Sequence, residues 1–302
     1  MAAEIHLKKE GIPQGHINTK NGMNLWYSTI IAIHFRRYKM ETRIVYRSKS
    51  KAVRYFGYPD MHIPDHDEEA VAVAEAAQRE FRPDYSIVGN DLLQATPFSR
   101  FGNQTIKEAV AMDFQETELN PANAHIDRVQ KYTKIETIFQ EGNHDAHIER
   151  WAAQHSKGSM SIFSLISPEA NLSKGRKNFR YVKQGEVVQL HPNLICVHGW
   201  SYSVHCAAAH RQKSPLQSVV FNHAHRRQSD TLTYPSAEMP TEAMCAGCLC
   251  HRMPMYKHDG NPTGWTHGFW VAYVGKQDFT IYSVPINKGR AILPNGKEIK
   301  II

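Results

Sequence analysis

Five short clusters of histidine, aspartate and asparagine stand out along the chain, each with residue types that can bind a metal ion. In chain order they are Asp60-Met61-His62, Asn90-Asp91, Gly142-Asn143-His144-Asp145, His198-Gly199 and His223-Ala224-His225. Imidazole nitrogens, carboxylate oxygens and the neutral Asn143 carbonyl form a mixed set that suits Mn, Fe or Zn better than Ca. Two such ions, about 3.5–4 Å apart, can hold a phosphoryl group and lower the pKa of a water between them. The clusters therefore indicate metal-assisted hydrolysis of a phosphoester.

The spacing inside the clusters lets their members face a common ion. Asp60 and His62 are two residues apart, as are His223 and His225, so both members of a pair can turn inward in an irregular loop. Asp91 offers two carboxylate oxygens, which can bridge two cations. Each cluster alone could equally be a turn or a surface segment, since Gly, Asn and Asp are common there. Five of them in one chain favour a metal site.

Each cluster follows a segment that we expect to be a strand, and loops at strand ends are where α/β proteins place their sites. The sequence predicts strands at Ala52–Gly57, Tyr85–Gly89, Lys134–Gln140, Tyr181–Val188, Leu194–Val197, Ser218–Phe221, Phe269–Val274 and Phe279–Val284. It predicts helices at Asp67–Phe81, Ile106–Tyr132 (interrupted at Pro121), Ala146–His155 and Ser203–Gln212, and a loop over Ser156–Asn178. This order predicts an α/β fold, a four-layer sandwich of two mixed β-sheets flanked by helices.

Residues 1–50 are rich in Lys, Arg, Asn and Gly, and we expect an N-terminal extension of unknown role, with Trp26–Phe35 as one strand or helix. Residues 51–302 then form the catalytic domain. The net charge of +7 favours a polyanionic partner such as nucleic acid, although no long basic run concentrates it. Without a secretory signal or a membrane-spanning stretch, we expect a cytoplasmic protein with no membrane partner.

Taken together, the five clusters resemble the calcineurin-like metallophosphoesterase superfamily. Its pattern is D-x-H, G-D-x-x-D, G-N-H-[DE], a lone His and G-H-x-H. This chain has D-M-H at 60–62, N-D-L-L-Q at 90–94, G-N-H-D at 142–145, V-H-G at 197–199 and N-H-A-H at 222–225. The resemblance covers about residues 52–284 and is nearest in layout to the compact phage and bacterial branch near the repair exonucleases. It implies the metallo-dependent phosphatase fold, and the host cytoplasm as the location if a phage encodes the chain.

The resemblance also implies a role for each residue. The first of two divalent metal ions, Mn foremost with Fe or Zn as alternatives, would be bound by Asp60, His62 and His225. The second would be bound by Asn143, His198 and His223, and Asp91 would bridge both. His144 would bind no metal; it would face the phosphate and protonate the leaving oxygen or stabilise its charge while a metal-activated water attacks.

Two departures from the family pattern bear on activity. Gln94 stands where the family usually has an Asp, which in several branches pairs with the catalytic histidine and raises its pKa. We therefore expect His144 to be a weaker acid in this chain. Asn222 stands where Gly usually precedes the His-x-His pair, at a position that often has an unusual backbone angle. Asn tolerates a positive φ better than other residues with a side chain, so we expect the loop to form.

The substrate remains open at the level of sequence. A phosphodiesterase or nuclease acting on DNA is favoured by charge and by the resemblance. The alternatives are a phosphomonoesterase, a cyclic nucleotide phosphodiesterase, and a catalytically weak protein that binds metal and nucleic acid. Arg226 and Arg227 follow His225 directly and either hold a phosphate backbone or are solvated charges.

A second cluster, Cys245-x-x-Cys248-x-Cys250-His251, has the residue types of a structural zinc site. Zinc sites usually draw two ligand pairs from separated segments, and here four ligands fall within seven residues. Free thiols at the rim of the active site are therefore favoured over zinc. Nearby aromatic residues, including Trp265, Phe269 and Trp270, are expected to pack in the core rather than to stack on nucleobases.

Overall fold

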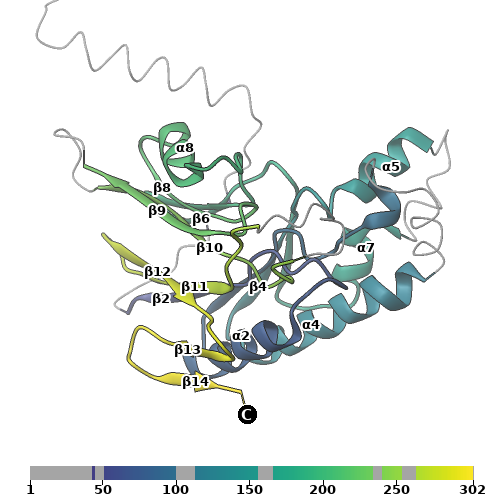
Figure 1. The fold of residues 1–302 in the computed structure, drawn as a ribbon, viewed down its shortest axis with the longest axis horizontal. Coiled ribbons are helices and arrows are strands. Elements are labelled where there is room, and N and C mark those ends of the chain that lie inside the picture. The colour runs from purple at the N-terminus through teal and green to yellow at the C-terminus, as the bar shows by residue number, and fades with distance from the viewer. Residues whose placement is uncertain are drawn as a thin grey trace, which may run out of the picture. The chain divides into compact units, whose positions relative to one another are not determined.

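A computed structural model of the chain describes residues 51–99, 113–155, 166–233, 240–253 and 263–301, and the backbone of residues 43–44. The described part contains two six-stranded mixed sheets and a two-stranded hairpin. The hairpin consists of β13 (Arg290–Ile292) and β14 (Glu298–Lys300). Figure 1 shows the two large sheets one above the other, with helices outside them.

The first sheet, called sheet I, carries the first three clusters. Its order is β12 (Phe279–Pro285), β11 (Gly268–Val274), β2 (Val53–Gly57), β3 (Tyr85–Gly89), β4 (Glu136–Gln140) and β5 (Phe179–Val182). Strands β2 to β5 run parallel, whereas β11 is antiparallel to both β2 and β12. The carboxyl ends of β2, β3 and β4 therefore meet at one edge of sheet I.

Sheet II carries the other two clusters. Its order is β1 (Arg43–Ile44), β6 (Val188–His191), β7 (Leu194–Val197), β8 (Ser218–Phe221), β10 (Thr241–Ala246) and β9 (Arg227–Leu232). Strands β7, β8 and β10 run parallel, and β6 and β9 are antiparallel to their neighbours. The carboxyl ends of β7 and β8 place His198 and the His223–His225 pair side by side.

Strand alternation explains how the sheets pack. Successive side chains of a strand point to opposite faces, so a strand buried on both faces has an almost continuous apolar sequence. Along β2, β3 and β4, side chains alternate between two cores. One core lies between the two sheets, and the other lies between sheet I and the helices that cover it. Tyr55, Ile87 and Ile138 pack between the sheets against residues such as Val220 and Met244. Their neighbours Phe56, Val88 and Phe139 pack under the helices, with Ala74 of α2 and Ile126 of α4.

The helices cover the outer faces of the two sheets. They are α2 (Glu68–Phe81), η2 (Gln115–Leu119), α4 (Asn120–Lys131), α5 (His147–His155), α7 (Pro168–Ser173), α8 (Cys206–Lys213) and the short turn η1 (Thr96–Phe98). Helices α2 and α4 pack on sheet I, and α8 packs on β8, β9 and β10 of sheet II. The predicted four-layer α/β sandwich is confirmed. Among the described helices, none has the length and apolar character needed to cross a bilayer.

Most predicted elements are present, and helix α2 shows why. Asp67 caps it by accepting a hydrogen bond from the backbone N–H of Ala70 (2.9 Å). Arg82 ends it with a left-handed φ of 51°, directly before Pro83. Capping by Asp and termination next to Pro are local signals that a sequence displays directly.

Two predictions of elements are wrong, and a third is confirmed. The strand predicted at Tyr181–Val188 is two strands, β5 and β6, because Gly185 turns the chain with a φ of 89°. The segment predicted as a loop to Asn178 contains helix α7, which Ser167 caps through the backbone N–H of Ala170 (3.4 Å). The predicted interruption at Pro121 is confirmed: the π-helix η2 ends at Leu119 and α4 begins at Asn120, with Pro121 in its first turn, where its missing N–H is not needed.

Other expectations are missed or lie outside the described residues. Strands β9 and β10 were not predicted. Of the expected N-terminal extension, Arg43 and Ile44 form β1, which pairs with Val188 and Gln189 of β6. Trp26–Phe35 and the start of the helix predicted at Ile106 lie outside the described residues.

Candidate metal centre

The structure brings the five clusters together at one edge of the two sheets. Four overlapping groups of potential ligands form there, each with its donor atoms within 4.8 Å of one another; two of them, His62–Asp91–His144 and His225–Cys248–Cys250, share members with the two groups that hold the predicted ligands. Of the latter two, the first group is Asp60, His62 and His225, and the second is Asp91, His198 and His223. These are the six nitrogen and carboxylate ligands that the sequence predicts, divided as the sequence predicts, with Asp91 grouped with the second set.

The first group is compact and buried. The Nε2 atoms of His62 and His225 lie 3.2 Å apart, and the His225 Nε2 lies 3.3 Å from an Asp60 carboxylate oxygen. Both Asp60 oxygens also accept from the backbone N–H of His223, at 3.0 Å each. The carboxylate of Asp60 is thus held in place by the loop that carries the histidines of sheet II.

The second group surrounds one nitrogen. The Nε2 of His198 lies 2.8 Å from the Asn143 Oδ1, 3.1 Å from the His223 Nδ1 and 3.2 Å from the Asp91 Oδ2. Asn143, predicted as a neutral oxygen ligand, therefore points into this group. The two imidazoles, one amide oxygen and one carboxylate converge from four different loops.

Asp91 links the two groups. Its Oδ2 lies 3.2 Å from the Nε2 of His198 and 3.8 Å from the Nε2 of His62. Its other oxygen, Oδ1, accepts a hydrogen bond of 2.7 Å from the backbone N–H of His144. One carboxylate oxygen therefore faces both sets of ligands, and the other fixes the loop that carries the predicted acid.

Backbone strain is concentrated at this edge. Six residues of the clusters have a positive φ: Asp60 (40°), His62 (53°), Asn90 (53°), Asp91 (70°), His223 (71°) and His225 (54°). A left-handed backbone costs a residue with a side chain about 1–2 kcal/mol. Strain of this kind persists at sites where geometry serves a function. Asn222 is not among these residues, so the expectation that its φ is unusual is wrong; the unusual angle belongs to His223.

Gly142 and Asp145 fit the β3 and β4 loops together. A Cβ atom on Gly142 would lie 2.1 Å from the Asp91 Oδ1, so only glycine allows this approach. The buried Asp145 carboxylate accepts backbone N–H groups from Asp91 (3.0 Å), Leu93 (2.9 Å) and Gly142 (2.9 Å). We gave Asp145 no role from the sequence, although its place in the G-N-H-[DE] motif was the available signal.

Burial sets the protonation of the histidines. Burial, together with the neighbouring His144, lowers the pKa of His62 to about 3. Burial and the nearby His198 lower the pKa of His223 to about 4. Both imidazoles are therefore neutral near pH 7 and carry the lone pair that a metal ligand needs.

The acidic side chains respond to the same burial. Burial would raise the pKa of Asp91, but the imidazoles of His198 and His144 hold it well below its usual range. For Asp60, burial dominates and raises the pKa to about 7. For His198, burial would lower the pKa, but Asp91 raises it to about 9. Without a cation, His198 is therefore protonated near pH 7, and it would give up this proton on binding one. Imidazoles, an amide oxygen and carboxylates held together in this way are a donor set that fits divalent cations.

Gln94 differs from its expected role. Its side-chain Oε1 lies 2.7 Å from the Nδ1 of His62, and both side chains are buried. The Nδ1 of His144 instead lies 2.9 Å from the backbone carbonyl oxygen of Gln94. The Gln94 side chain therefore does not take the place of the family's Asp beside His144, because the loop after β3 turns it toward His62, a predicted metal ligand.

The two arginines predicted to hold substrate have other contacts. Arg226 donates to the backbone carbonyls of Tyr202 (3.0 Å) and Ser203 (2.7 Å). Arg227 begins β9, and its Nε donates to the Ser283 hydroxyl (2.8 Å). Both guanidinium groups thus brace neighbouring segments.

The cysteines form no disulfide and do not lie at a rim, and Cys248 and Cys250 form a potential ligand group with His225. Cys245, Cys248 and Cys250 are all buried. The Sγ of Cys250 lies 3.6 Å from the Nδ1 of His225, behind the first group, whereas His251 is exposed and lies near Asp67. Trp265 packs against His225 with ring centroids 4.1 Å apart, and Phe269 and Trp270 are fully buried, as expected for core residues.

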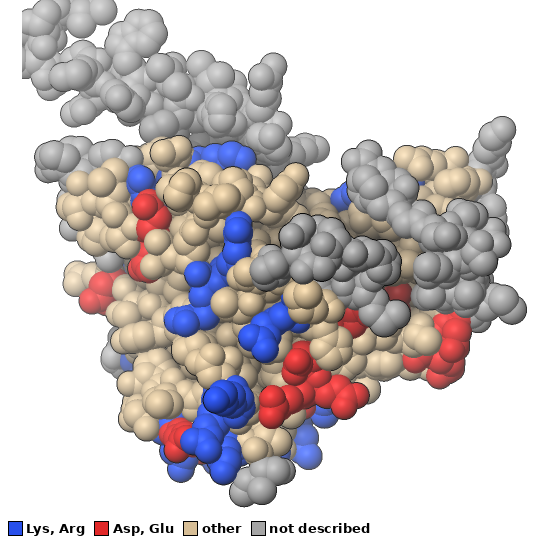
Figure 2. Space-filling model, viewed as in Figure 1, with Lys and Arg blue, Asp and Glu red and all other residues tan. Residues whose placement is uncertain are grey.

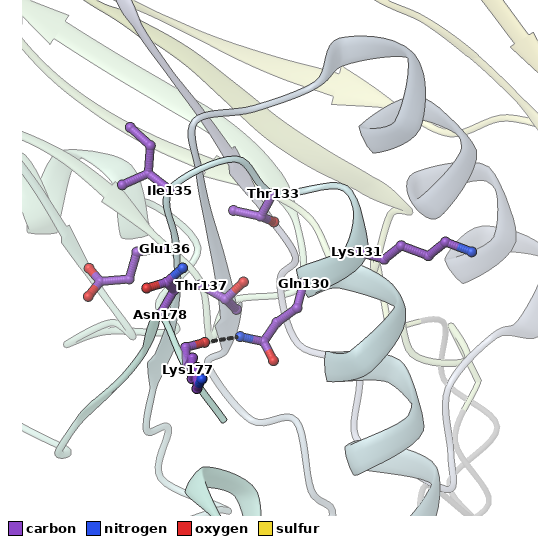
Figure 3. Close-up of a pocket in the computed structure, with 8 residues that line it drawn as sticks. All are labelled: Gln130, Lys131, Thr133, Ile135, Glu136, Thr137, Lys177 and Asn178. Carbon is purple, nitrogen blue, oxygen red and sulfur yellow. Dashed lines mark hydrogen bonds between the residues drawn. The ribbon is translucent and has the colours of Figure 1, made fainter. Parts of the chain in front are cut away.

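A cavity of about 310 Å³ lies elsewhere, at the amino end of β4 (Figure 3). It is lined by Gln130, Lys131, Thr133, Ile135, Glu136, Thr137, Lys177 and Asn178. Gln130 closes one side by donating to the backbone carbonyl of Lys177 (3.0 Å). The candidate metal centre follows the carboxyl end of β4, so this cavity is not part of it.

No protein-family model matches the chain, and no curated protein matches it. Among solved structures, the chain is similar to Vacuolar Protein Sorting 29 from Cryptosporidium parvum, with 13% identity, a TM-score of 0.43, and 83% of this chain and 100% of that chain covered. It is also similar to Vps29 from Chaetomium thermophilum, with 12% identity, a TM-score of 0.41, and 82% and 93% covered. The same protein complexed with a RaPID-derived cyclic peptide, RT-D3, gives 10% identity, a TM-score of 0.39, and 82% and 92% covered.

Proposed function

We propose that the chain is a dinuclear metal-dependent phosphoester hydrolase. The position of Asp91 carries this proposal: one carboxylate oxygen lies 3.8 Å from His62 of the first group and 3.2 Å from His198 of the second. A carboxylate that lies between two sets of nitrogen and oxygen donors is what a pair of cations requires. The concentration of left-handed residues at the same edge supports it.

Each group would hold one cation, Mn foremost, with Fe or Zn as alternatives. Asp60, His62 and His225 would hold the first, and Asn143, His198 and His223 would hold the second, with Asp91 shared. Bound divalent cations supply Lewis-acid activation of water and of the phosphate. His144 is partly exposed, and its Nδ1 is engaged by the Gln94 carbonyl, so its Nε2 is the nitrogen that can give a proton to the leaving oxygen.

Among possible phosphoester substrates, we favour DNA, whose backbone is a phosphodiester. The net charge of +7 attracts a polyanion. On the face shown in Figure 2, Lys and Arg form several separate groups and no continuous basic patch. We therefore assign the charge a role in general attraction and none in reading a sequence. Phosphomonoesters and cyclic nucleotides are the alternatives that the same centre can serve.

The test combines metal content with cleavage. Labelled single- and double-stranded DNA would be incubated in Mn²⁺ with wild type, His144→Ala, Asp91→Asn and, as a control, His155→Ala, whose side chain is exposed at the end of α5. We expect wild type and His155→Ala to cleave. We expect His144→Ala to keep its metal and lose about 10²–10⁴-fold in rate, since general acid catalysis contributes that much. Asp91→Asn should lose metal and activity together.

Three other results would contradict or narrow the proposal. Wild type that binds no Mn²⁺ would overturn the proposal. Metal bound without cleavage of DNA, but with turnover of small phosphomonoesters or cyclic nucleotides, would exclude the nuclease and keep the hydrolase. Metal and DNA binding with no turnover of any of these would instead identify a binding protein.

A further inference from the structure

The loop of residues 199–205, between β7 and α8, presents an aromatic side chain beside the second group of ligands. Tyr202 is 77% exposed, and its ring centroid lies 5.8 Å from that of His223. Trp200 (39%) and Val204 (70%) are also exposed in this loop. The other aromatic residue near the centre, Trp265, packs against His225 and is only partly exposed. Among the described residues, Tyr202 is thus the most exposed aromatic ring at this site.

The backbone of this loop is held in place from both sides. Arg226 donates to the carbonyls of Tyr202 (3.0 Å) and Ser203 (2.7 Å), and Gln228 donates to the carbonyl of Val204 (2.8 Å). At the start of the loop, the backbone N–H of Trp200 donates to the Nε2 of the buried His210 (2.7 Å). Ordering a loop in this way costs conformational entropy. These contacts leave the Tyr202 ring exposed, so burial of the ring does not offset the entropy lost when the loop is ordered.

A flat group joined covalently to a phosphate fits this arrangement. The ring adjoins His223, which we assign to the second metal, where the phosphate of a substrate is held. A group that reaches Tyr202 must therefore be attached to that phosphate through a short linker. Nucleobases meet this condition through their sugar, and every base has a face that stacks on an aromatic ring. The net positive charge of the chain suits the phosphates of the same ligand.

We propose that Tyr202 is a stacking platform for a nucleobase of the substrate, next to the metal centre. This inference rests on the proposed function and narrows it to phosphoesters of nucleotides. The base would lie on the phenol ring, and the loop braced by Arg226 and Gln228 would fix the ring before the substrate arrives. Stacking on an aromatic ring does not distinguish one base from another, so the platform would accept any base.

The experiment compares two ligands that differ only in the base. Adenosine 5′-monophosphate and ribose 5-phosphate would be titrated calorimetrically into the Mn²⁺-loaded full chain, with His144→Ala as the background to stop turnover. In that background we expect the nucleotide to bind at least about fivefold more tightly, the lower end of what stacking contributes. Adding Tyr202→Ala should remove this preference and leave ribose 5-phosphate binding unchanged. Adding Tyr202→Phe should keep the preference, because the ring remains.

Tyr282→Ala serves as a control, since Tyr282 is a partly exposed tyrosine (39%) on β12 and should not affect either ligand. Equal affinity for the two ligands before Tyr202 is changed would overturn the stacking platform and leave the hydrolase intact. An equal loss for both ligands in Tyr202→Ala would overturn it too. If neither ligand binds in Mn²⁺ although the chain is folded, the proposed function fails along with the platform.

Discussion

Gln94 contacts two histidines of the centre through two different oxygens. Its side-chain Oε1 accepts from the Nδ1 of His62 (2.7 Å), and its backbone carbonyl accepts from the Nδ1 of His144 (2.9 Å). A hydrogen bond at one ring nitrogen assigns the proton there and leaves the other nitrogen free. One residue therefore directs the Nε2 of a metal ligand and the Nε2 of the predicted acid into the same space.

The two contacts predict a separable effect at this residue. Gln94→Leu removes the acceptor for His62 but keeps the carbonyl that holds His144. We expect the affinity for Mn²⁺ to fall about 10–100-fold, the range seen when partners of metal-binding histidines are removed. The single-turnover rate at saturating Mn²⁺ should stay close to that of wild type. Gln94→Glu keeps an acceptor and should largely restore affinity. A reduced rate at saturating metal, with unchanged affinity, would show that residue 94 acts on His144 instead.

At the scale of elements, the loops after β3 and β4 approach each other so closely that Gly142 has no substitute. A Cβ atom there would lie 2.1 Å from the Asp91 Oδ1 and 2.3 Å from its backbone nitrogen. Gly142→Ala should therefore push the two loops apart, lower Mn²⁺ content and destabilise the fold. Gly175→Ala is the control, because a Cβ at Gly175 meets nothing within 4 Å and only the φ of 74° is strained. It should bind metal normally and unfold slightly earlier in a thermal melt. Normal metal content in Gly142→Ala would contradict the account.

The elements also show what a sequence can and cannot predict. Strand β3 was predicted correctly because all five of its residues are buried and apolar residues dominate it. Strand β9 was missed because it is a polar edge strand, Arg227–Leu232, with most of its residues exposed or half-exposed, so hydrophobic patterning has nothing to detect. The pair β5 and β6 was merged because the turn at Gly185 interrupts an otherwise favourable pattern. A strand that is buried on both faces has an apolar sequence, which can be recognised from its own residues. A polar edge strand forms because of its pairing with a neighbouring strand, which its own residues do not indicate.

The site follows the same rule. The order of the five clusters predicted which loops meet, since each follows a strand. The partner of Gln94 could not be predicted, because it depends on contacts between two loops: the backbone N–H of Ile63 donates to Leu92 (2.8 Å), and that of Gln94 donates to Ile63 (2.9 Å). Tyr202 was missed because an exposed tyrosine in a short loop has no pattern of its own.

At the scale of the whole molecule, the cost of burying an acid outside the metal centre predicts how stability depends on pH. Glu118 lies in η2, fully buried, and one of its oxygens accepts from the backbone N–H of Ala95 (2.7 Å). The other oxygen has no hydrogen-bond partner among the described residues. Burial is the largest influence on this carboxyl and raises its pKa from 4.5 to about 8. The folded protein therefore keeps a proton on Glu118 at neutral pH, where the unfolded chain has lost it.

This difference gives the sign of the effect. A folded state that binds more protons than the unfolded state loses stability as the pH rises. The contribution of Glu118 is complete below pH 4.5, declines as the pH rises from 4.5 to about 8, and is absent above that. Glu118→Gln cannot ionise and should be progressively more stable than wild type across this window. Urea unfolding of both proteins would be measured in EDTA from pH 5 to pH 9. The difference between their free energies of unfolding reports on Glu118 alone, because the two proteins share all their other titrating groups. Parallel curves would mean that Glu118 is already ionised in the folded protein, and that the backbone N–H of Ala95 is enough to stabilise a buried carboxylate.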